Sequence, residues 1–580
     1  MAVRRGVLIV FALIIAAVAV SAAGLLFIGI AVGGGPKISS NSTLVIDISG
    51  DLLENEPGGV INQFLEPQPT VRAVIDSLRK AAVDRRITSV IIRPTGNAAL
   101  WGKMQEIRSA IVEFKKSKKP IIAYLEYGGD QQYYVASACD KVFLMPAASL
   151  DLTGMASYEV FLRGMLDKIG ALPDAIHVGD YKTASNTFTE YTFTPAHREM
   201  AESLNSDLYQ QLVKGVAEGR KKTEAQVRQL LDHGPYLPED AVRAGLVDDL
   251  AYEDELDDKT KLGPGRTNTL KQHDYRNIGS TSLGLNRGPR IAVIYAVGII
   301  STGASNYDSP SQVIGSDTMV EYLRKARADD SIRAIVLRID SPGGSAIASD
   351  VIWREIMLTR EKKPVIASMS DVAASGGYYI AMPAHAIVAQ PATLTGSIGV
   401  VLVRFVIGGT LQKLGINMET VKEGQYADIY SPVRPFTPDE RKKLGELMQA
   451  TYDTFVEKAA AGRNTTPERI DAVAQGRVWT GKQAKDLGLV DELGGMDRAL
   501  QIAKERAKIA ATAEVELVVF PPKKSILEVV ANPLGRSTDG AALNALVGRQ
   551  NARTIEAATA PLRLFRRGEP LTLMPNVFVR

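Results

Sequence analysis

Short apolar runs alternate along the chain with longer segments of mixed polarity. The run 44–48 ends at Gly50, and the runs 90–92 and 335–337 each follow a segment of helical character. Apolar runs of this length, rich in Val and Ile and separated by helical segments, are typical of buried parallel strands. The pattern therefore predicts an α/β fold.

The same pattern occurs twice. Leu78-Arg79-Lys80-Ala81 matches Leu323-Arg324-Lys325-Ala326, and the offset of 245 residues holds without a gap to Arg93 and Arg338. Further matches follow at offsets of 242 to 245 residues, among them Lys119-Pro120 with Lys363-Pro364, Tyr133-Tyr134 with Tyr378-Tyr379, and Thr194-Pro195 with Thr437-Pro438. We predict two homologous domains, 37–285 and 286–520, joined through a polar linker at 254–289 and followed by a tail, 521–580.

The N-terminal segment is uncharged from Gly6 to Gly35 and follows Arg4 and Arg5. Its length suffices for the ~20 residues that span a bilayer and exceeds the ~7–15 apolar residues of a cleaved signal peptide. We predict a transmembrane anchor, 1–36, with the arginines in the cytoplasm and the remaining chain on the far side. The alternative is that this segment is a signal peptide that is cleaved off.

Composition and charge limit the classes of function that the chain can have. The 580 residues are 45% hydrophobic and 23% charged, with a formal net charge of +3, which is typical of a folded protein of several domains. No polybasic or basic-aromatic pattern indicates nucleic acid, and no Cys/His cluster has metal-ligand spacing. Cys139 is the single cysteine, so no intramolecular disulfide can form, and we expect it to be buried.

The two copies differ where chemistry is expected. In the second copy, the run 364–367 leads into Ala373-Ala374-Ser375-Gly376-Gly377, whereas the first copy has Asp130 at the position of Ser375. The second copy also carries a glycine-rich loop, Ser341-Pro342-Gly343-Gly344-Ser345, that the first lacks. Both loops would face one crevice at the carboxyl ends of parallel strands, where α/β sheets bind ligands.

A lysine shows the reverse distribution. Lys182 in the first copy aligns with Ala427 in the second. A serine at a strand-to-helix turn is suited to be a nucleophile but needs a base. None of the five histidines lies in the serine or glycine loops, so a lysine neutralised by burial is the candidate base. Taken singly, a capped turn and a surface lysine are the commoner explanations of Ser375 and Lys182.

Together these motifs resemble the long, tandem-domain form of signal peptide peptidase A, also called protease IV. The resemblance covers nearly the whole chain beyond the predicted anchor. It includes the glycine loop 341–345, the turn 373–378, Leu-Thr-Gly-Ser-Ile-Gly at 394–399 and Tyr-Lys-Thr-Ala at 181–184. It implies two ClpP/crotonase-like domains and a serine endopeptidase that needs no cofactor.

The resemblance also implies roles for individual residues. Ser375 would be the nucleophile, Lys182 the general base and Ser397 the group that orients the lysine, although a capped turn would explain Ser397 nearly as well. Backbone N–H groups of Gly376 and of Gly343 or Gly344 would form the oxyanion hole. The implied substrates are signal peptides and other extended apolar peptides. The implied assembly is a homotetramer in the bacterial inner membrane, with its catalytic domains on the periplasmic side.

Two other functions are compatible with parts of this pattern. A crotonase-like acyl-CoA enzyme would share the fold and use the glycine loop for a thioester oxyanion. A non-catalytic membrane scaffold would explain the anchor and the duplication. Neither explains why the serine and the lysine are retained in different copies.

Overall fold

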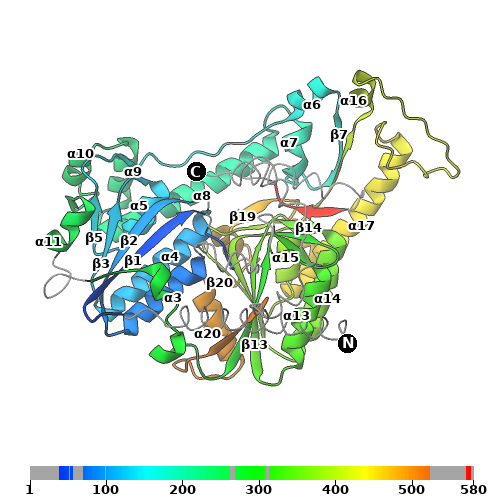
Figure 1. Cartoon of the computed structure of the whole chain (residues 1–580). Coiled ribbons are helices and arrows are strands. Elements are labelled where there is room, and N and C mark those ends of the chain that lie inside the picture. The colour runs from blue at the N-terminus through cyan, green and yellow to red at the C-terminus, as the bar shows by residue number, and fades with distance from the viewer. Residues whose placement is uncertain are drawn as a thin grey trace, which may run out of the picture.

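The computed structural model describes residues 38–50, 52–55, 70–97, 99–260, 268–307, 312–522 and 570–575 (Figure 1). The predicted anchor, 1–36, lies outside these residues. Among the helices of the described ranges, none combines the length and apolarity needed to cross a bilayer.

Strands from the first half of the chain form a parallel sheet. Its order is β8-β5-β3-β2-β1-β9, and every neighbouring pair is parallel. The strands are β1 (Ser42–Gly50), β2 (Ile87–Asn97), β3 (Ile121–Leu125), β5 (Lys141–Leu144), β8 (Asp249–Leu250) and β9 (Asn268–Lys271). All five residues of β3 are buried, as expected for a strand covered on both faces.

A second sheet, built from residues 290–520, repeats this plan. Its main path is β19-β17-β15-β13-β10-β21, and β16 and β20 extend it beside β15. The pairs are parallel except β17 with β19, which is antiparallel. The strands are β10 (Arg290–Val297), β13 (Ile332–Ser341), β15 (Val365–Ala374), β16 (Ala386–Ala389), β17 (Leu394–Gly396), β19 (Val478–Thr480), β20 (Glu492–Leu493) and β21 (Glu516–Phe520). Helix α20 (Met496–Arg506) buries Met496 and Ala499 against one face.

The duplication extends to individual hydrogen bonds. Lys119 Nζ donates to the carbonyl of Ala81 at 2.7 Å, and Lys363 Nζ donates to that of Ala326 at 3.0 Å. Helices α3 (Val71–Val83) and α13 (Ser316–Ala328), which end near these carbonyls, have the same length and the same offset of 245 residues. The predicted α/β fold and internal repeat are therefore confirmed.

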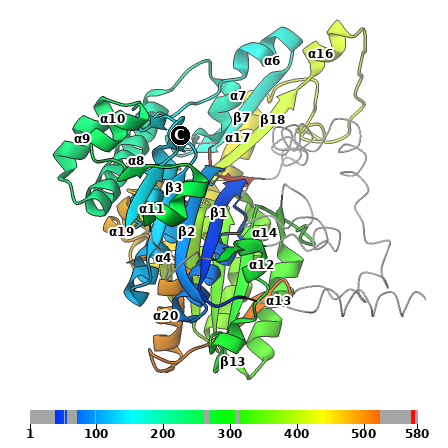
Figure 2. The same cartoon turned by 60° about the vertical axis from the view of Figure 1, so that its left-hand side comes forward.

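A third sheet joins the two halves, and the alternation of strands and helices did not predict it. Its order is β12-β11-β14-β22-β18-β7, and its last three pairs are antiparallel. The strands are β12 (Val313–Gly315), β11 (Ile299–Ser301), β14 (Gly343–Ser345), β22 (Leu571–Leu573), β18 (Val400–Val406) and β7 (Leu172–Val178). Strand β7 of the first half lies along β18 of the second over its full length, as Figure 2 shows.

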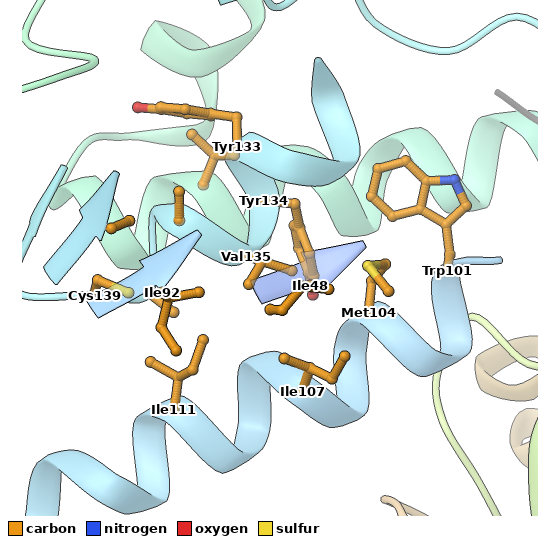
Figure 3. Close-up of a cluster of buried hydrophobic side chains, with 14 of the residues drawn as sticks. Ile48, Ile92, Trp101, Met104, Ile107, Ile111, Tyr133, Tyr134, Val135 and Cys139 are labelled. Atoms are coloured by element: carbon orange, nitrogen blue, oxygen red, sulfur yellow. The ribbon is translucent and has the colours of Figure 1, made fainter. Parts of the chain in front are cut away.

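The largest apolar cluster of the first half lies between its sheet and the helices α4 (Trp101–Phe114) and α5 (Asp130–Ala136) (Figure 3). Trp101 and Tyr134 meet edge to face within it, with ring centroids 5.6 Å apart. Cys139 is buried in the same cluster with a free thiol, which confirms the prediction. Ala374 and Leu394 of the second half complete the cluster, so the two halves share a core.

Buried charges also bridge the halves. Arg338 on β13 forms ion pairs with Glu54 at 2.7 Å and with Glu106 at 2.6 Å. Burial alone would raise the pKa of Glu54, but Arg338 and Lys103 lower it to about 2. Both carboxylates belong to the first half, so this network ties the second sheet to the first half of the chain.

Candidate active site

Ser375 lies at the turn between β15 and α15 (Gly376–Ala381) and is fully buried. Its φ of 54° and ψ of −112° place a non-glycine residue in a sparsely populated region of backbone space. Its N–H donates to the carbonyl of Gly396 at 2.8 Å, which fixes the turn against the neighbouring loop. Strain of this kind at a serine between a strand and a helix is a feature of nucleophile turns.

Lys182 comes to this turn from the first half because of the pairing of β7 with β18. The chain leaves β7 at Gly179, whose φ is 100°, and the N–H of Tyr181 donates to the carbonyl of Gln475 at 2.9 Å. A Cβ at Gly476 would lie 2.4 Å from the backbone nitrogen of Lys182, and one at Gly399 would lie 3.1 Å from its Cδ. Residues 475–476 and Gly399 thus form a seat for the lysine, and a side chain added at Gly476 or Gly399 would collide with it.

The lysine amine lies between two serines. Its Nζ is 2.7 Å from Ser375 Oγ, 3.0 Å from Ser397 Oγ and 2.9 Å from the carbonyl oxygen of Ser397. Lys182 is fully buried, and burial lowers its pKa well below the usual value. This is the environment in which a lysine is neutral and can accept a proton.

The glycine loop lies against the serine turn. A Cβ at Gly376 would be 3.1 Å from Gly343 Cα, and a Cβ at Gly343 would be 2.7 Å from the nitrogen of Gly376. Gly343 and Gly344 have φ values of 102° and 154°, and the N–H of Gly343 donates to Ser341 Oγ at 3.1 Å. The structure therefore brings Ser375, Lys182, Ser397 and the three glycines together.

The equivalent position in the first copy has different chemistry. Asp130 begins α5 where Ser375 precedes α15, and its carboxylate accepts a hydrogen bond from the N–H of Gly154 at 3.2 Å. Burial raises the pKa of Asp130 to about 6. The carboxylate is held by backbone donors, so the first copy offers no hydroxyl nucleophile at this turn.

Sequence reasoning missed a cluster of charged side chains beside the serine turn and the glycine loop. Lys103 Nζ of the first half lies 2.7 Å from a carboxylate oxygen of Asp340 and 3.6 Å from one of Asp371. Asp340 directly precedes the loop 341–345, and Asp371 lies four residues before Ser375. Asp371 also accepts the N–H groups of Leu100 and Lys103, each at 2.8 Å. The available signal was an acidic residue in the last four residues of each of two largely apolar strands, Asp340 on β13 and Asp371 on β15.

Comparison with known protein families identifies the family of the chain. The model of a protein family described as Peptidase family S49 matches residues 113–263 and 357–510, one region in each half of the chain. The chain belongs to peptidase family S49. Its two matches agree with the duplication found in the sequence and the structure.

Relatives of this S49 peptidase align with most of its length. The chloroplastic serine protease SPPA of Arabidopsis thaliana is 39% identical over 511 residues, which cover 87% of this chain and 75% of the relative. Protease 4 of Salmonella typhi is 32% identical over 551 residues, covering 91% and 88%, respectively. Protease 4 of Haemophilus influenzae is 29% identical over 502 residues, covering 81% and 80%.

The S49 peptidase is accordingly a serine protease, as predicted. Its similarity to proteases over both halves argues against an acyl-CoA enzyme and against a non-catalytic scaffold.

Proposed function

We propose that the protein is an endopeptidase in which Ser375 is the nucleophile and Lys182 is the general base. The observation that carries the proposal is the 2.7 Å separation of Lys182 Nζ and Ser375 Oγ, at an amine that is fully buried. Heavy atoms at this distance are within direct proton-transfer reach.

Burial lowers the pKa of Lys182, and a neutral Nζ can satisfy all three contacts of the amine. A neutral amine has two N–H donors and one lone pair. The carbonyl of Ser397 can only accept, so it takes one N–H, and Ser397 Oγ takes the second. The lone pair is then directed at the Ser375 hydroxyl, which donates its proton. Ser397 is thus a positioning residue that holds the amine in the orientation for proton transfer.

The reaction follows from this geometry. Ser375 Oγ attacks the peptide carbonyl carbon as Lys182 takes the hydroxyl proton, and the N–H groups of Gly376 and of Gly343 or Gly344 stabilise the oxyanion. The C–N bond then breaks, and the lysinium protonates the leaving amine. Water hydrolyses the acyl-enzyme in a second cycle of the same proton transfers. Loss of one oxyanion donor would lower kcat on the order of 100- to 1,000-fold.

For substrates we propose extended apolar peptides, and in particular the signal peptides left after secreted proteins are cleaved. Strand β18, which begins three residues after Ser397, carries the buried apolar side chains of Val401 and Val403. The resemblance to protease 4 extends over both halves of the chain. We further propose a membrane-anchored homotetramer with its catalytic halves on the periplasmic side, and domain limits of 37–285 and 286–520.

A fluorophosphonate probe tests the pairing of serine and base. We expect it to label the wild-type protein at Ser375 and to label neither Ser375→Ala nor Lys182→Met. Lys442→Met is the matched control, because Lys442 is exposed and its loss should leave labelling intact. Undiminished labelling of Lys182→Met would show that the assigned base is wrong. Hydrolysis of a synthetic signal peptide by the wild type, and not by Ser375→Ala, tests the activity itself.

A further inference from the structure

A short strand near the C-terminus lies in the third sheet beside the catalytic loops. Strand β22 pairs antiparallel with β14 through Gly344 and Thr572, and antiparallel with β18 through Val401 and Leu571. In Figure 1 it is the red arrow next to β14. Since neighbouring strands lie about 4.8 Å apart, β14 and β18 border a slot roughly 10 Å wide that β22 fills.

Both walls of this slot adjoin the catalytic groups. Strand β14 contains Gly343 and Gly344, the candidates for the second donor of the proposed oxyanion hole, and β18 begins three residues after Ser397. The slot therefore has the position and the main-chain groups that an extended peptide substrate needs, because peptides can bind by adding a strand through main-chain hydrogen bonds.

The backbone of the segment 570–575 is held as such a peptide would be. The N–H of Met574 donates to the carbonyl of Pro342 at 2.8 Å, and the N–H of Ala346 donates to the carbonyl of Pro570 at 3.3 Å. Thr572 Oγ1 donates to the carbonyl of Gly344 at 3.1 Å. These bonds continue on both sides of the Gly344–Thr572 pair, so the segment follows the glycine loop along its length.

One carbonyl of the segment lies at the proposed oxyanion hole. A Cβ at Gly343 would be 1.9 Å from the carbonyl oxygen of Thr572 and 2.7 Å from the nitrogen of Gly376. The Thr572 oxygen and the Gly376 amide are thus neighbours across the space that the missing side chain leaves. Thr572 is fully buried, which also removes this space from solvent.

The side chains of the segment match an apolar groove. Leu571 is 2% exposed and packs with Val401 and Val403, and Leu573 packs against the same cluster. Met574 reaches the shared core on the other side. The six residues Pro-Leu-Thr-Leu-Met-Pro carry no charge.

We propose that the segment Pro570–Pro575 is a built-in peptide ligand that occupies the substrate groove of its own chain and competes with substrate. The proposal rests on the proposed function, because the groove is identified by Ser375 and its oxyanion donors. It also assigns substrate contacts: Val401 and Val403 would receive the apolar side chains of a bound peptide, and Gly344 would pair with its backbone.

Peptide hydrolysis by three variants tests the proposal. We expect a chain that ends at residue 569 and the full chain with Leu571→Asp to show a KM about tenfold lower than the wild type, with kcat unchanged. A tenfold change corresponds to ~1.4 kcal/mol of competition. Val421→Asp is the control, because Val421 is 98% exposed and the same charge there should leave KM unchanged. The synthetic peptide Pro-Leu-Thr-Leu-Met-Pro should inhibit the shortened chain competitively, and its Leu-to-Asp form should not.

Other results would overturn the proposal. An unchanged KM in Leu571→Asp, or no competition by the free peptide, would mean that the segment does not occupy the groove. If the KM of the wild type rises with enzyme concentration, the competing strand comes from a second copy of the chain and not from the same chain. If the shortened chain fails to fold, the KM of Leu571→Asp decides between the outcomes, provided that this variant is still labelled at Ser375. Absence of labelling and hydrolysis in every variant would instead refute the proposed function.

Discussion

Arg338 and Arg93 occupy equivalent positions in the two copies but have opposite surroundings. The side chain of Arg338 is 2% exposed and lies between Glu54 and Glu106, which are also buried. The side chain of Arg93 is 23% exposed, and the carboxylates it contacts are 43% to 59% exposed. The chain therefore contains its own control for the value of a buried ion pair.

We predict that Arg338→Met lowers the free energy of unfolding by about 3–5 kcal/mol, because it leaves buried carboxylates without their main partner. Arg93→Met should lower it by ~1 kcal/mol or less, since water screens its ion pairs. Urea unfolding followed by circular dichroism measures both. The double variant Arg338→Met/Glu54→Gln should recover part of the loss, because one of the unpaired charges is then absent.

The pH dependence gives a second measure of the same interaction. In the wild type the pKa of Glu54 is lowered to about 2, so its contribution to stability is present above pH ~4.5 and is lost as the pH falls toward 2. Without Arg338, burial would raise this pKa, so the difference between variant and wild type should narrow as the pH is lowered and Glu54 becomes protonated. Equal losses for Arg338→Met and Arg93→Met at pH 7 would refute the reasoning from burial.

Three further predictions concern the proposed catalytic groups. Because burial lowers the pKa of Lys182, fluorophosphonate labelling should rise with pH through that lowered pKa and level off well below 10.5; a rise that follows the ordinary lysine pKa would contradict a neutral amine. Gly476→Ala should lower kcat at least 100-fold with little change in circular dichroism, because its Cβ would displace the Lys182 backbone; near-normal kcat would mean that the seat is not needed. Ser397→Ala should lower kcat about tenfold by removing one of the two hydrogen bonds that orient the amine, and unchanged kcat would leave Ser397 without a positioning role.

The sequence could predict features that repeat or that differ between the copies. The offset of 245 residues between Arg93 and Arg338 predicted the duplicated sheets, and the complementary loss at Ser375 and Lys182 predicted that the two side chains meet. The buried role of Arg338 was not predictable, because its equivalent, Arg93, is partly exposed and the two sequences are locally alike. What separates them is Glu54, which is distant in sequence.

The third sheet escaped prediction for a related reason. Strand β22 is three residues long, and its partners on β14 and β18 lie well over 150 residues away along the chain. Its local pattern of Leu-Thr-Leu between prolines has no period long enough to indicate a strand. The antiparallel pairing of β7 with β18 likewise depends on how the two halves dock, and the sequence of one repeat unit does not indicate how it docks on the other.

The separation of Lys182 and Ser375 by 193 positions in the sequence has a consequence for synthesis. At ~5–20 residues per second, roughly 10–40 s pass between the incorporation of the lysine and that of the serine. Gly476, which seats the lysine, is translated later still. On the proposed assignment, a nascent chain has a base without a nucleophile, and it cannot cut itself or its neighbours until its second half has been made and docked.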